Sequence, residues 1–191
     1  MKKTLPNDTV EFLTRRNQVF RELANESDRG VVLVGATVLE ENLELVLRSV
    51  MKGHGEKALN DVVAPLFQGA GAFATFSAKI KCCYAFNLID ETAFKDLETI
   101  REIRNEFAHS YQTASFLSQS IKNKIANLSS GKVIEDKLTS PDMEIDVILE
   151  EGKPGIKMSV TKRRFVMSVA FLSSYFEAHI VEFRNLRDRM K

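Results

Sequence analysis

The chain has 191 residues, of which 44% are hydrophobic and 28% are charged, ordinary proportions for one globular domain with a real core. Its formal net charge of +1 gives the whole molecule no long-range attraction to nucleic acid or to an anionic membrane. The first residues lack the apolar core of a secretory signal, and no apolar run reaches membrane-spanning length. The two cysteines, Cys82 and Cys83, are adjacent and have no other cysteine to pair with, so we expect a reduced, cytoplasmic protein without a membrane segment.

Long segments of 3.6-residue periodicity and only four prolines predict an all-α chain. We expect a single domain over residues 1–191, built as a bundle of about six to eight helices. The first helix is predicted over residues 8–25. The second, over residues 29–51, follows the start signal at Ser27 and Asp28. Its glycines, Gly30 and Gly35, allow another helix to approach closely.

The middle of the chain predicts several shorter helices. One over residues 56–64 stops near Pro65, and the small-residue loop after it reads as close packing because it lacks the lysine and strand context of a phosphate-binding loop. Ser77 is the predicted cap of the next helix, and Asp90 or Thr92 opens another. That helix has an apolar face of Phe94, Leu97, Ile100, Ile103 and Phe107, and a further helix is predicted over residues 113–128.

Residues 129–160 interrupt the helical pattern with prolines and glycines. Two partly alternating segments, 143–149 and 156–160, predict a small β-hairpin in this insertion. A long last helix is predicted from Thr161 onward, and it or the second helix could supply a homodimer interface.

The octet "IRNEFAHS" closes the helix that precedes residue 113. On a helical wheel Arg104 lies about 40° from Ile100, inside the apolar arc, whereas Asn105 and His109 lie on the opposite side. We therefore expect Arg104 to be a partly buried anchor, with Glu40 or Asn42 of the second helix as its acceptor. Arg104 and His109 lie about 140° apart on a continuous helix, so a shared site requires a bend or a second protomer.

A basic run of Lys162, Arg163 and Arg164 follows an acidic stretch near the C-terminus. It is either a solvated segment, a surface for a protein partner, or a contact to DNA, although the neighbouring acids would repel phosphates. No helix-turn-helix pattern is visible, and no motif for a metal, a cofactor or a nucleophile is found. We expect no cofactor and no metal.

Three blocks in fixed order, residues 28–47, 66–90 and 96–110, resemble the mannitol operon repressor (MtlR-like) family. The resemblance implies an all-helical, cytoplasmic bacterial protein that represses transcription of a sugar-alcohol uptake operon. It implies no catalytic residues. Because no DNA-reading motif is visible, repression through a protein partner is the expected route.

Arg104, Asn105 and His109 also resemble the R-x4-6-H motif of HEPN domains, which are helical, often dimeric, and in many cases metal-independent ribonucleases. By that likeness Arg104 and His109 would cleave RNA across a dimer cleft, with Asn105 in support. A histidine can move the 2′-hydroxyl proton and an arginine can stabilise the phosphorane charge. RNA binding or RNA cleavage is therefore the alternative to transcriptional regulation.

Overall fold

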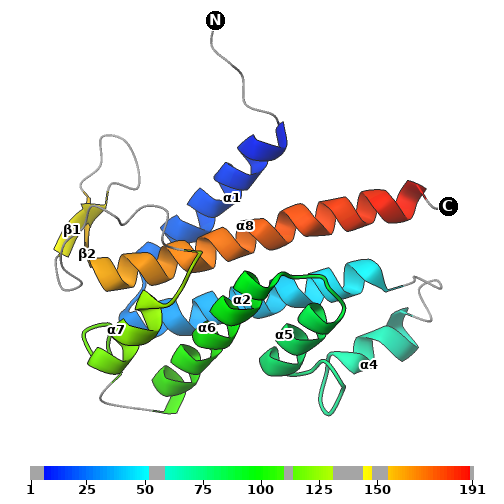
Figure 1. Ribbon diagram of the computed structural model, residues 1–191, viewed down its shortest axis with the longest axis horizontal. Helices are drawn as coiled ribbons and strands as arrows, with labels where there is room; N and C mark the ends of the chain where they lie inside the picture. Colours follow the sequence, from blue (N-terminus) through cyan, green and yellow to red (C-terminus); the bar gives the residue numbers. More distant parts are fainter. Residues whose placement is uncertain (1–6, 52–58, 110–113, 131–143, 148–154, 190–191) are drawn as a thin grey trace, which may run out of the picture.

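The computed structural model describes residues 7–51, 59–109, 114–130, 144–147 and 155–189, and the side chains of residues 14–51, 60–109, 114–130 and 155–181. Figure 1 shows the arrangement of its helices, which dominate the fold and confirm the all-α prediction. In chain order the elements are α1 (Asn7–Ala24), α2 (Asp28–Val50), the π-helical turn η1 (Leu59–Val63), α4 (Ala64–Leu66), α5 (Phe76–Ala85), α6 (Glu91–His109), α7 (Gln119–Ala126), β1 (Glu144–Val147), β2 (Ile156–Ser159) and α8 (Val160–Arg189).

Helix α2 is the central element of the bundle. It packs against α8 on one side and against α5 and α6 on the other, while α1 crosses α8 (Figure 1). The buried side chains of α2 recur at helical spacing and include Val32, Ala36, Leu39, Leu43 and Val46. Each α2 neighbour contributes an apolar stripe to the same core, as expected when amphipathic helices bury their apolar faces.

The two glycines of α2 have different roles. A Cβ at Gly35 would lie 3.2 Å from Cγ2 of Val169, so this glycine permits the close approach of α8. A Cβ at Gly30 would instead meet Glu26 and Ser27, which belong to the turn before α2. The prediction of a helix contact is therefore confirmed at Gly35 and wrong at Gly30.

The starts of α5 and α6 were predicted to within two residues, whereas the start of α7 was not. Asp90 caps α6, since its Oδ1 accepts a hydrogen bond from the backbone N–H of Ala93 at 2.8 Å. The cap of α5 is Thr75 rather than Ser77, because Thr75 Oγ1 accepts from the N–H of Ala78 at 3.1 Å. Helix α7 begins at Gln119, six positions after the predicted residue 113, and residues 110–113 lie outside the described chain.

The hairpin predicted in the insertion is present among the described residues. β1 and β2 pair antiparallel, with Glu144 opposite Ser159 and Val147 opposite Ile156. Helix α8 then starts at Val160, directly after β2. The connection over residues 148–154 lies outside the described part of the chain.

Helix α7 is tethered at both of its ends. Before it, Asp28 Oδ2 accepts from Ser115 Oγ at 3.3 Å and from the N–H of Phe116 at 3.4 Å. After it, the buried carboxylate of Asp96 accepts from the backbone N–H groups of Ser129 and Ser130, at 2.9 and 2.7 Å. These contacts hold the short helix α7 against the bundle.

Candidate functional site

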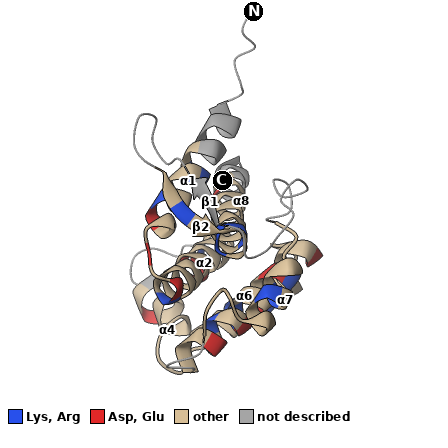
Figure 2. Ribbon diagram, turned by 90° about the vertical axis from the view of Figure 1, so that its left-hand side faces the viewer, with Lys and Arg blue, Asp and Glu red and all other residues tan. Residues whose placement is uncertain are grey.

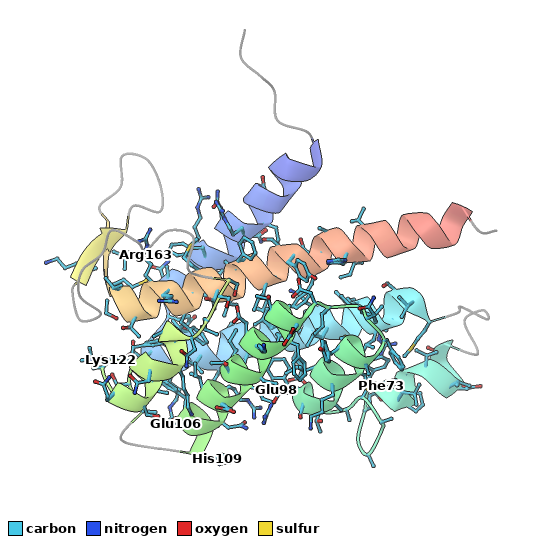
Figure 3. All side chains as sticks on the ribbon, in the orientation of Figure 1. Phe73, Glu98, Glu106, His109, Lys122 and Arg163 are labelled. Atoms are coloured by element: carbon cyan, nitrogen blue, oxygen red, sulfur yellow. The ribbon has the colours of Figure 1, made fainter. Side chains whose placement is uncertain are left out.

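The described part of the octet, residues 103–109 at the end of α6, does not form a closed site within one chain. Arg104 is exposed, and its Nη1 donates to Oδ1 of the adjacent Asn105 at 3.2 Å. His109 is exposed in the last turn of α6 (Figure 3). Because α6 is continuous from Glu91 to His109, Arg104 and His109 remain about 140° apart around its axis.

The prediction of a buried Arg104 was wrong. A helical wheel gives the direction of a side chain but not whether a neighbouring helix covers it. No hydrogen bond or ion pair joins Arg104 to Glu40 or Asn42 in the described structure. An exposed guanidinium keeps its hydration, whereas a buried one would lose it and would need acceptors to offset that loss.

Glu40 instead belongs to an ion-pair network centred on Lys79. Only 5% of Lys79 is exposed, and its Nζ lies 3.1 Å from Glu40 Oε1 and 3.2 Å from Glu44 Oε2. Arg48 pairs with the same Glu44 at 2.9 Å and stacks over the ring of Phe67, 4.2 Å from its centroid. The network joins α2, α5 and the turn after α4 through charged and aromatic contacts.

Asn42 lies in the contact between α2 and α8. Its Nδ2 donates to Oγ of Ser173 at 2.7 Å, and both residues are buried. Two polar side chains can be buried in a helix interface when they hydrogen-bond to each other, because the bond offsets the loss of their contacts with water. Asn42 is therefore a structural anchor, with a different partner from the one predicted.

The basic run at the start of α8 is largely used for internal contacts. Lys162 Nζ donates to the carbonyl oxygen of Glu26 at 2.6 Å and lies 3.7 Å from Asp28 Oδ1. Arg164 Nη2 donates to the carbonyl oxygens of Ala126 and Leu128, at 3.0 and 2.9 Å, and so closes the C-terminal end of α7.

Arg163 differs from its two neighbours. It is half-exposed and makes no hydrogen bond or ion pair with any other residue that the structure describes. Arg163 lies at the start of α8, well separated from His109 at the end of α6 (Figure 3). Lys162, Arg163 and Arg164 were proposed as a surface for a partner or for nucleic acid. Among the contacts that the structure describes, Arg163 is the one of the three whose guanidinium is not used by the chain itself.

Sequence reasoning missed the two most buried charges, Lys79 and Asp96, which are 5% and 2% exposed. A signal for both was present. Lys79 lies beside the apolar positions Phe76 and Ile80 on the face of α5, and Asp96 precedes Leu97 on the apolar arc of α6. A charged residue inside an apolar arc predicts either a buried ion pair or an exposed helix end.

Thiol and metal chemistry find little support in the described residues. Burial and the neighbouring Cys82 raise the pKa of Cys83 from an ordinary 9.0 to about 12, so Cys83 stays a protonated core thiol. No cluster of three histidine, cysteine or acidic side chains suited to a metal ion occurs in the described part of the chain. Within those same residues, no helix is long and apolar enough to cross a membrane.

The fold and these side chains define an all-helical bundle in which the buried charged groups connect helices to one another. Among solved structures, the chain is similar to the possible transcriptional regulator YggD from Shigella flexneri, with 13% identity and a TM-score of 0.58 over 94% of this chain and 98% of that one. It is also similar to the X-ray structure of the MtlR–HPr complex from Escherichia coli, with 19% identity and a TM-score of 0.58 over 90% and 99% of the two chains. At these identities the similarity shows a shared fold.

The family model "Mannitol repressor", MtlR, matches residues 15–175, which cover most of the chain. The protein therefore belongs to the mannitol repressor family, and the family defines it as a repressor-like regulator. The resemblance found in the sequence is confirmed. No match was found among curated protein sequences.

Proposed function

We propose that this protein lowers expression of a sugar-alcohol uptake operon by binding a protein partner, and that this partner is an HPr protein. The family match carries the regulatory role, and the Escherichia coli relative was crystallised as an MtlR–HPr complex. In this proposal residues 1–191 act as one cytoplasmic unit without catalysis, cofactor or metal.

The contacts of the basic run favour a protein partner over operator DNA. A phosphate-binding surface needs several lysine and arginine groups that can replace counterions. Lys162 and Arg164 already donate to backbone carbonyl oxygens of the same chain. Among the described contacts of this run, Arg163 is left as one cation, which is too few for sequence-independent attachment to a duplex.

The ribonuclease alternative has no supporting contact among the residues that the structure describes. RNA cleavage by this motif needs the arginine and the histidine at one phosphate. Arg104 bonds to Asn105 and points away from His109, and the family match concerns repressors. We therefore propose no ribonuclease activity.

Isothermal titration with HPr from the same species tests the proposal directly. We expect saturable one-to-one binding and, in cells, a rise in the operon transcript when the gene is deleted. A gel-shift with the operon's own promoter at low salt should show no complex with the chain alone at micromolar protein. Absence of HPr binding, or an unchanged transcript after deletion, would contradict the proposal.

A charge-reversal pair separates the DNA route from the protein route. If the chain does shift DNA, Arg163→Glu should weaken that binding and reduce the slope of log affinity against log salt by about one. Arg104→Glu, an equal charge change at an exposed residue of α6, is the matched control. A slope that changes with Arg163→Glu alone would establish direct DNA contact and would overturn the preference for a protein route.

A further inference from the structure

We draw no further inference here: the strongest candidate, the uncharged surface that residues 62–78 form around α4 (Figure 2), carries no proposal because nothing in the structure shows what covers it.

Discussion

Replacing Lys79 by methionine should destabilise the protein although the methionine keeps most of the side-chain volume. The substitution removes the ammonium group between Glu40 Oε1 and Glu44 Oε2, at 3.1 and 3.2 Å. Two carboxylates then remain near a buried position without their shared cation. Removing one partner of a fully buried pair lowers stability by about 3 to 5 kcal/mol.

The expected loss for Lys79→Met is smaller than that, because the two acids are not fully buried. The side chains of Glu40 and Glu44 are 27% and 28% exposed, and Arg48 still pairs with Glu44. We therefore expect the free energy of unfolding to fall by about 2 to 3 kcal/mol. Urea denaturation followed by far-ultraviolet circular dichroism measures this change directly.

Two further variants make the reasoning refutable. Lys95→Met is the matched control, since Lys95 pairs with Glu91 at 2.6 Å on a surface where both side chains are about two-thirds exposed, and its unfolding curve should overlay the wild type. Adding Glu40→Gln to Lys79→Met removes one unpaired carboxylate and should restore part of the loss. An unchanged curve for Lys79→Met, or no recovery in the double variant, would refute the account of the network.

Three more predictions concern Asp96, the loop that contains Gly69 and Gly71, and the two cysteines. Asp96→Ala should lower the free energy of unfolding by about 2 to 4 kcal/mol, because it leaves the backbone N–H groups of Ser129 and Ser130 without their acceptor. The same change should remove hydrogen-exchange protection at these two amides, and amides that stay protected would contradict the prediction. Gly71→Ala should lower the melting temperature more than Gly69→Ala, because the new Cβ would clash with backbone atoms at Gly71. At Gly69 the space is open, and only the positive φ of +56° disfavours alanine. Equal melting temperatures would argue against the tight loop. Iodoacetamide at pH 8 should label the half-exposed Cys82 before Cys83, as read by mass spectrometry. Because the pKa of Cys83 is raised to about 12 in the folded state, its contribution to stability is complete below pH 9 and is lost as the pH rises toward 12; rapid labelling of native Cys83 would contradict this.

Periodicity and capping chemistry predicted most of the fold. The apolar arcs of α2, α6 and α8, the Asp90 cap and the hairpin in the insertion could all be derived from local sequence, because each depends on residues within a few positions of one another. The family could also be predicted, because the three sequence blocks that suggested it all lie within the region that the family model matches.

The site was less predictable because its contacts depend on how helices pack. Asn42 was expected to bond to Arg104, yet its partner Ser173 lies 131 positions further along the chain. The wheel placed Arg104 inside the apolar arc of its helix, but no other described helix covers that position, so the side chain is exposed. A wheel describes one helix, whereas burial is a property of several helices together, so the unpredicted Lys79 is buried and Arg104 is exposed.

The packing of α8 on α1 and α2 has a consequence for synthesis of the protein. Helix α8, which follows all the other described helices in the chain, supplies the surface on which α1 and one side of α2 pack, as the contacts of Gly35 with Val169 and Asn42 with Ser173 show. Contacts of such high sequence separation form late and slow folding. The apolar face of α1 and the side of α2 that packs on α8 therefore stay exposed until α8 has been synthesised, which makes this small bundle a natural client for chaperones that bind emerging chains.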